Sequence, residues 1–307
     1  MARTDRTDRP EARAGVADVD LGSRTAVVTG STAGIGRALA HALGRLGADV
    51  LVQGRDRDAG RAVVADLRAL GVDATFQAAD FTDAAAVRGL ATAAREWADG
   101  IDLLVHNAGA LFREGRLTGL GVERTFQVNH LAPYLLTAEL LDALTADARV
   151  VTTASEGHRG VALGLDSVTD LEGYSGSRAY RRSKLANVAF AAELAHRLEV
   201  AGRSVTSNAL HPGAVPGTGF SRFLPDPLPG IVRRLDALPF LASVTEAAAT
   251  PLFLAASPRV AGVSGRYFVD CRPRTPAAPA RDPDTRRRLW TRSASLLGIE
   301  PPLADGA

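Results

Sequence analysis

The sequence is poor in cysteine and has no long apolar runs. Of its 307 residues one is cysteine, Cys271, which excludes an internal disulfide and a cysteine-based metal cluster. The same scarcity fits a reducing compartment such as the cytoplasm. No run of 18 apolar residues occurs, and the first 20 residues lack the apolar stretch of a signal peptide. We therefore expect a cytoplasmic protein without a membrane-spanning helix.

Lysine is nearly absent although basic residues are common. Of the 36 basic residues, all but Lys184 are arginine. Surface charge tolerates either residue, whereas a site that needs a compact ammonium does not, so Lys184 is a candidate for a chemical role. The net charge of +2 is small and no basic face is visible in the sequence, which argues against a nucleic-acid partner.

Apolar, β-branched runs alternate with segments of helical spacing from Ser23 onward. This alternation predicts an α/β fold: a single doubly wound Rossmann-type domain with a mostly parallel seven-stranded sheet and helices on both faces. The predicted strands are 25–29, 49–53, 72–78, 101–106, 149–154, 204–210 and 265–270. The predicted helices are 33–46, 57–70, 83–97, 122–144 with a kink at Pro133, 179–199, 245–256 and 285–297.

Three regions depart from the alternating pattern. We expect residues 1–22 to form a disordered arm, residues 23–271 the catalytic domain, and residues 272–307 a linker followed by a C-terminal docking helix. Residues 217–244 include Pro225, Pro227 and Pro229 and many apolar side chains without a clear period. Because they follow a strand end, we predict a lid over a hydrophobic substrate.

A glycine-rich turn, TGSTAGIG, joins the first predicted strand to the first predicted helix. Glycines let the backbone approach a pyrophosphate, and the helix N-terminus supplies free N–H groups. The strand–turn–helix context predicts a dinucleotide site. Its predicted residues in this turn are Gly30, Ser31, Thr32, Gly34, Ile35 and Gly36.

The end of the second strand bears on the choice between NAD and NADP. An acidic residue there would bind the ribose 2′-hydroxyl and repel a 2′-phosphate. The strand ends instead in Gln53, Gly54 and Arg55, and arginine can bind a phosphate with two parallel hydrogen bonds. This favours NADP(H) over NAD(H). NAD(H) stays the alternative, because Arg55 could be an ordinary solvated surface residue and the neighbouring Asp56 is acidic.

Tyr180 and Lys184 form a YxxxK pattern within a predicted helix, so both face the same side. A nearby ammonium lowers the pKa of a phenol, as an oxidised nicotinamide does, and makes it a usable acid–base group. Ser155 ends a strand and can donate to a substrate oxygen, although a turn-capping serine is the alternative. Asn129 lies beside the predicted kink, where a buried structural amide is the alternative.

The glycine spacing and the YxxxK pattern resemble the short-chain dehydrogenase/reductase family. The resemblance implies a catalytic tetrad of Asn129, Ser155, Tyr180 and Lys184, in which Asn129 helps to place a water beside the lysine. It also implies cofactor contacts beyond the turn and Arg55: Asp80, Phe81, Asn107, Ala108, Gly109, Tyr180, Lys184, Pro212, Gly213 and Val215. Segments 126–131, 183–187, 211–213 and 267–271 look like the retinol dehydrogenase/WW-domain oxidoreductase branch.

The resemblance, which covers about residues 23–300, implies an NADP(H)-dependent oxidoreductase. Hydride would pass between the nicotinamide and a hydrophobic carbonyl or alcohol. A binding protein that senses NADP(H) without turnover and a sugar-nucleotide epimerase of the extended type are the alternatives. His158 and His211 lack partners at metal-ligand spacing, so no metal is expected. Two points stay open: a homodimer formed through residues 179–199, and a contact of Thr218 with the nicotinamide.

Overall fold

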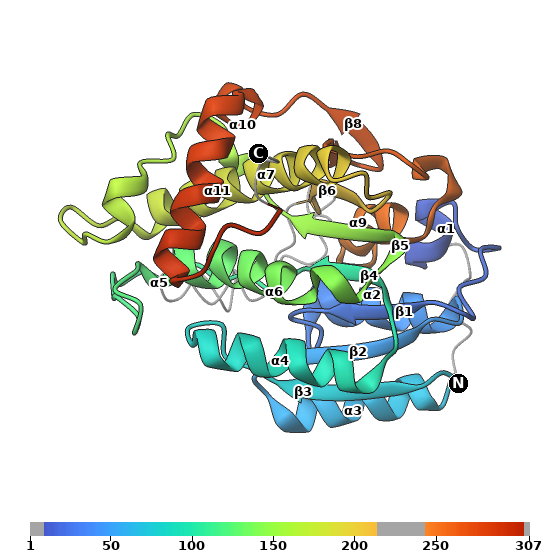
Figure 1. The fold of residues 1–307 in the computed structure, drawn as a ribbon. Coiled ribbons are helices and arrows are strands. Elements are labelled where there is room, and N and C mark those ends of the chain that lie inside the picture. Colours follow the sequence, from blue (N-terminus) through green and yellow to red (C-terminus); the bar gives the residue numbers. More distant parts are fainter. Residues whose placement is uncertain (1–8, 214–242, 304–307) are drawn as a thin grey trace.

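A computed structural model describes residues 9–213 and 243–303 as an eight-stranded sheet covered by helices on both faces (Figure 1). The strand order is β3-β2-β1-β4-β5-β6-β7-β8, and all neighbours are parallel except the last pair. The strands are β1 (Thr25–Val28), β2 (Asp49–Gly54), β3 (Ala74–Ala78), β4 (Ile101–His106), β5 (Leu144–Thr153), β6 (Thr206–His211), β7 (Tyr267–Val269) and β8 (Arg272–Arg274). The predicted doubly wound fold is confirmed, with eight strands instead of seven.

Two hydrophobic clusters fill the space between the sheet and the two helical layers. One layer contains α1 (Pro10–Ala14), α2 (Gly34–Arg45), α3 (Arg57–Arg68) and α9 (Val244–Ala256). The other contains α4 (Ala84–Trp97), α5 (Arg124–Phe126), α6 (Ala132–Leu140), α7 (Gly176–Val200), α10 (Ala278–Arg281) and α11 (Pro283–Leu297). From β1 the strands are added outward to β3 on one side, and the chain then crosses to the other side of β1 to form β4. In doubly wound sheets, such a switch point places a crevice at the carboxyl ends of the two strands.

The predicted helix 122–144 is wrong as one continuous element. The structure has α5, a π-helical turn at Gln127–Leu131, α6, a 3₁₀ turn at Leu141–Ala143, and then β5, which begins at Leu144. Pro133 is the second residue of α6 and directly follows the π turn, with Leu131 and Ala132 before it in helical conformation. The irregular part is instead the π turn, which carries Asn129.

Residues 9–22 do not form the disordered arm that the sequence suggested. Gly15 ends the short helix α1 in a left-handed conformation, and the side chains of Val16 and Leu21 are buried in the core. Arg13 also pairs with Glu246 at 2.9 Å, which joins α1 to the start of α9. Because this segment has many charged residues and only a few small apolar ones, its composition did not predict that it is ordered.

The predicted linker after residue 271 is ordered as well, because it contains β8 and α10. β7 and β8 form a hairpin whose turn residues, Asp270 and Cys271, have φ values of 49° and 57°. Two-residue hairpin turns of this kind favour glycine in the second position, and Cys271 in that position explains why no hairpin was predicted. Within residues 9–213 and 243–303, no helix combines the length and apolar character needed to cross a bilayer.

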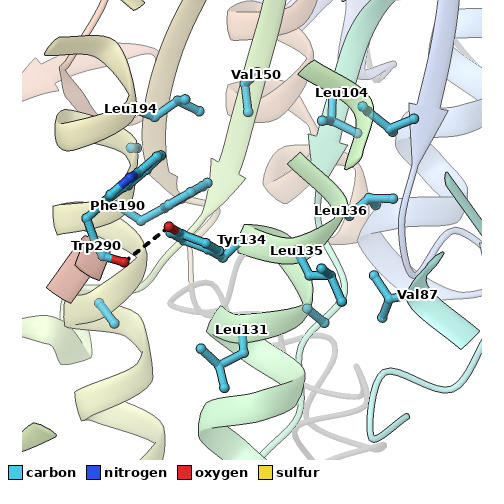
Figure 2. Packing of buried hydrophobic residues seen from close by; sticks show 14 of the residues in the cluster. Val87, Leu104, Leu131, Tyr134, Leu135, Leu136, Val150, Phe190, Leu194 and Trp290 are labelled. Atoms are coloured by element: carbon cyan, nitrogen blue, oxygen red, sulfur yellow. Dashed lines mark hydrogen bonds between the residues drawn. The ribbon is translucent and has the colours of Figure 1, made fainter. Parts of the chain in front are cut away.

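The C-terminal helix α11 packs on α6 and α7 through an aromatic cluster (Figure 2). The Trp290 ring is stacked on Phe190, with 5.8 Å between centroids, and meets the edge of Tyr134 at 4.8 Å. The Tyr134 hydroxyl donates to the Trp290 carbonyl oxygen at 3.1 Å. Leu289 and Leu297 are also buried, so α11 is part of the core and covers one face of α7.

Replacing Trp290 with alanine should lower the free energy of unfolding by about 3–5 kcal/mol, because a buried indole leaves a cavity that neighbours fill only partly. Chemical denaturation measures this change. The exposed neighbour Thr291 provides the control: Thr291→Ala should change the free energy by less than about 0.5 kcal/mol. Equal stability of the Trp290→Ala and wild-type proteins would contradict the packing of α11.

Candidate active site

The glycine-rich turn after β1 packs so tightly that Gly30 and Gly36 have no room for a side chain. Gly30 has a φ of 63°, and a Cβ there would lie 2.8 Å from the Ala108 Cα. A Cβ on Gly36 would lie 2.3 Å from the Gly30 carbonyl oxygen and 2.4 Å from the Asn107 Nδ2. The turn therefore requires glycine for backbone approach, as a pyrophosphate cradle does.

Helix α2 begins directly after this turn, at Gly34. Its N-cap residue, Ala33, carries no polar side chain, and its first turn contains no acidic residue. The N–H groups and the positive end of the helix dipole are therefore available to a phosphate. The glycine cradle and the uncapped helix together fit a dinucleotide cofactor.

Asn107 and Gln53 hold the glycine turn in place. The Asn107 Nδ2 donates to the carbonyl oxygens of Thr29 and Gly30 at 3.0 and 3.2 Å. The Gln53 Oε1 accepts from the Gly30 N–H at 2.9 Å, while its Nε2 donates to the Ala79 carbonyl at 2.7 Å. This role of Gln53 was not predicted from the sequence, although a polar amide at the end of an apolar strand was a usable signal.

The side chains of several predicted cofactor residues are engaged inside the protein. Ser31 is fully buried, and its Oγ donates to the Val28 carbonyl oxygen at 2.6 Å. Phe81 is part of the hydrophobic core. Thr32 and Ile35 are partly exposed at the turn. Ser31, Phe81 and Asn107 can therefore shape the site or offer backbone atoms to a cofactor, with their side chains already committed.

Arg55, beyond the end of β2, lines a cavity of about 310 Å³ together with Asp80, Arg116 and Arg124. The Arg55 Nη1 lies 3.9 Å from the Asp80 Oδ2, and both side chains are largely exposed. The Arg124 guanidinium lies 3.7 Å above the Phe112 ring, in the same wall. Three arginines and one carboxylate, that of Asp80, thus line the cavity, which gives it a net positive character.

Asp56, the acidic residue that kept NAD(H) as the alternative cofactor, does not line this cavity. Its carboxylate caps helix α3 and accepts from the N–H groups of Asp58 and Ala59 at 3.1 and 3.0 Å. The acid next to Arg55 therefore has a structural role of its own.

Lys184 lies on α7 and reaches under the carboxyl end of β5. Its Nζ donates to the Thr153 carbonyl oxygen at 3.0 Å and lies 5.6 Å from the centroid of the Tyr180 ring. No other acceptor of this ammonium occurs among the residues that the structure describes. Burial lowers the pKa of Lys184 to about 8, and two N–H donors remain for a ligand.

Tyr180 stands one helical turn before Lys184 and is hydrogen-bonded to the side chain of Ser155. Burial raises the pKa of the Tyr180 phenol, and the Ser155 hydrogen bond opposes this effect. Burial has the larger effect, so the pKa of the phenol lies above its ordinary value of 10.0. The phenol is protonated at neutral pH.

Ser155 follows β5 and begins the 3₁₀ turn Glu156–His158. Its Oγ accepts from the Gly157 N–H at 3.1 Å, so it caps this turn while also contacting Tyr180. The two interpretations of Ser155 offered by the sequence are therefore compatible.

Asn129 is fully buried in the π turn and ties together two parts of the site. Its Nδ2 donates to the Ala110 carbonyl oxygen at 2.8 Å and to the Ser183 Oγ at 2.9 Å, and its Oδ1 accepts from the Ala110 N–H at 2.7 Å. A Cβ on Gly109 would lie 3.2 Å from the Lys184 Nζ and 3.5 Å from the Asn129 Oδ1. Asn129 thus acts as a structural amide that fixes the loop beside the lysine.

Pro212 and Gly213 follow β6 at the same edge of the sheet, and Gly213 has a φ of 94°. Val215, Thr218 and nearly all of the predicted lid, residues 217–242, lie outside the described residues.

Taken together, these contacts bring Ser155, Tyr180, Lys184 and Asn129 to the strand ends beside the glycine turn.

The chain is similar to known proteins over most of its length. The family model for short chain dehydrogenases matches residues 24–226. Retinol dehydrogenase 14 of Homo sapiens is 36% identical over 296 residues, which cover 90% of this chain and 87% of that protein. Polyprenol dehydrogenase of Mus musculus is 40% identical over 294 residues, which cover 92% and 86% of the two chains.

A solved structure supports the same relationship. The short chain dehydrogenase from Burkholderia cenocepacia in complex with NADP has a TM-score of 0.65 and 28% sequence identity, covering 80% of this chain and 95% of that one. The glycine cradle and the Ser155–Tyr180–Lys184 cluster stand where such a fold binds a dinucleotide. The chain therefore belongs to the short-chain dehydrogenase/reductase family and is an NAD(P)-dependent oxidoreductase acting on CH–OH groups.

Proposed function

We propose that this protein interconverts a hydrophobic alcohol and its carbonyl with a preference for NADP(H). The observation that carries the proposal is the buried cluster of Ser155, Tyr180 and Lys184 beside the glycine turn. The cofactor would lie across the strand ends, with its pyrophosphate on Gly30 and Gly36 and its ribose near Lys184. When bound, its nicotinamide supplies the hydride for reduction or accepts it in oxidation.

In the reductive direction, Ser155 and Tyr180 would hold the carbonyl oxygen between their hydroxyl groups. Both donors are fixed before the substrate arrives, which favours the negative charge that develops on this oxygen. The Tyr180 phenol would donate its proton to this oxygen as the carbonyl carbon is reduced. Because burial raises the pKa of the phenol, this proton is present at neutral pH.

Lys184 would support the phenolate that remains. Its ammonium lies 5.6 Å from the Tyr180 ring, close enough to favour the negative charge in a site shielded from water. Water then returns the lost proton to Tyr180 by way of Lys184. Asn129 contributes by fixing the Ala110 backbone and Ser183 on either side of the lysine.

The cofactor preference rests on the charge of the cavity around Arg55. A ribose 2′-phosphate in this cavity would meet Arg55, with Arg116 and Arg124 in the same wall. A 2′-hydroxyl would gain less from these charges. The carboxylate of Asp56 is held by the backbone of α3 and does not oppose the phosphate there.

We expect Arg55→Asp to lower kcat/KM for NADPH by about 10–100-fold, since a hydrogen bond to a charged group contributes about 1.5–3 kcal/mol. The value for NADH should fall by less than about threefold. Steady-state kinetics with both cofactors measures the ratio. Arg57→Asp is the matched control, because Arg57 is also exposed, two residues further at the start of α3, but lies outside the cavity. An unchanged ratio in Arg55→Asp would contradict the preference.

The relatives named retinol dehydrogenase and polyprenol dehydrogenase support an apolar substrate. A panel of retinaldehyde, long-chain aldehydes, aromatic ketones and small polar carbonyls, assayed by NADPH oxidation, tests this proposal. We expect turnover that rises with the apolar surface of the substrate. Turnover confined to the polar carbonyls would refute the substrate class, and NADPH binding without any turnover would indicate a sensing protein.

A further inference from the structure

We propose that His158 is a positioning residue that orients Ser155 for the reaction. This inference rests on the proposed function, because it takes Ser155 as the hydroxyl that contacts the substrate oxygen. His158 lies three residues after Ser155, at the end of the 3₁₀ turn that Ser155 begins. From the sequence, the only prediction for His158 was that it has no partner at metal-ligand spacing.

Both ring nitrogens of His158 are engaged, and their partners fix the tautomer. The backbone N–H of Ala277 donates to Nε2 at 3.1 Å, so Nε2 is the acceptor and carries no proton. The proton therefore resides on Nδ1, which lies 2.6 Å from the Ser155 carbonyl oxygen and donates to it. The imidazole is neutral and joins the backbone of Ser155 to the chain after β8.

The ring has no freedom to turn away from these partners. His158 is fully buried. The edge of its ring packs against Tyr267 with 4.8 Å between centroids and 64° between planes. Tyr267 in turn donates its hydroxyl proton to the Glu156 Oε1 at 2.7 Å. The C-terminal segment that contains β7 and Ala277 thus forms a rigid support behind the turn.

Other contacts hold this turn without touching Ser155. Arg159 donates to the Thr275 carbonyl oxygen at 2.9 Å, and Arg181 donates to the Gly157 carbonyl oxygen at 3.1 Å. They fix the ends of the turn, whereas the imidazole reaches Ser155 itself. Rotation of the peptide after Ser155 would move the Gly157 N–H, which donates to the Ser155 Oγ at 3.1 Å and so directs that hydroxyl. A displacement of about 1 Å at a reacting group can cost about 100-fold in rate.

Two substitutions separate the halves of this bridge. In His158→Asn the side-chain amide nitrogen occupies the region of Nδ1 and can still donate to the Ser155 carbonyl oxygen, but it is too short to reach Ala277. In His158→Gln the longer side chain places its oxygen near Nε2, where it can accept from the Ala277 N–H. The Ser155 carbonyl oxygen then loses its side-chain donor and keeps only the backbone N–H of residue 158, which lies 3.0 Å away. Both variants replace the imidazole ring with a primary amide.

The experiment compares kcat, the KM for the carbonyl, NADPH affinity by fluorescence titration and the denaturation midpoint of wild type and both variants. We expect His158→Gln to lower kcat by about 10–100-fold, and His158→Asn by less than about fivefold. NADPH affinity should stay within about twofold of wild type in both, because neither change touches the glycine turn. The denaturation midpoints of the two variants should be similar.

Unchanged kcat in His158→Gln would overturn the inference. So would a loss that is equal in both variants and follows their stability, or a larger loss in His158→Asn, since either outcome would assign His158 to holding the C-terminal segment. Wild-type protein that turns over no carbonyl would defeat the proposed function itself, and this inference with it. An active wild type with kcat insensitive to position 158 would defeat the inference alone.

Discussion

Tyr180→Phe should lower kcat for carbonyl reduction by about 10²–10⁴-fold, the range expected for removal of a general acid. The variant keeps the ring, which is largely buried on α7, and loses only the proton that passes to the substrate oxygen. NADPH affinity should stay within about threefold of wild type, because the glycine turn and Lys184 are untouched. Stopped-flow measurement of NADPH oxidation gives kcat, and fluorescence titration gives the affinity.

Tyr134→Phe provides the matched control for this loss. Its hydroxyl donates to the Trp290 carbonyl oxygen in the α6–α11 core and has no part in the site. Its kcat should equal that of wild type, with a loss of about 1 kcal/mol in stability. If Tyr180→Phe retained more than about a third of wild-type kcat, another group would have to be the acid.

The second large effect concerns Lys184. Lys184→Met should lower kcat/KM by about 10³-fold or more, because the site loses both the charge beside Tyr180 and the donors that face the cofactor. The loss relative to wild type should be largest below a pH of about 8, where the wild-type ammonium is charged, and should shrink above it. Wild-type activity that survives the substitution would show that the chain's only lysine has no role in the reaction.

The pH dependence of the wild type follows from the same ammonium. Burial brings the pKa of Lys184 down from its ordinary value of 10.5 to about 8, because the charged form loses hydration. The ammonium is present below this pH and is lost as the pH rises through it. kcat/KM, which reports the free enzyme, should therefore decline above a pH of about 8. Lys184→Arg keeps its charge, so whatever activity it retains should show no such decline.

The sequence predicts the elements that obey simple periodicity or strict sterics. The apolar strands, the glycine turn and the YxxxK pair were all placed correctly, because each rule there is local. The solitary Lys184 was also informative, since only a chemical need explains one lysine among so many arginines. Its buried position beneath β5 agrees with that inference.

What escaped prediction depends on contacts that are distant in the chain. The roles of Gln53 and His158 arise only when Ala79 and Ala277 come close to them in the fold. The hairpin at Asp270 has turn residues without the usual preference for a positive φ, and the π turn at Asn129 has no sequence rule of its own. The pKa of Tyr180 likewise depends on burial, which no local pattern reveals.

The most direct test of the reaction follows the hydrogen itself. NADPH carrying deuterium at C4 of the dihydronicotinamide, prepared with the label on either face, is incubated with the enzyme and retinaldehyde or another active hydrophobic carbonyl. Mass spectrometry should find one deuterium on the carbinol carbon of the alcohol with one of the two labelled cofactors, and almost no alcohol with Tyr180→Phe. An alcohol without deuterium from either cofactor, or labelled alcohol formed as fast by Tyr180→Phe, would contradict hydride transfer governed by this cluster.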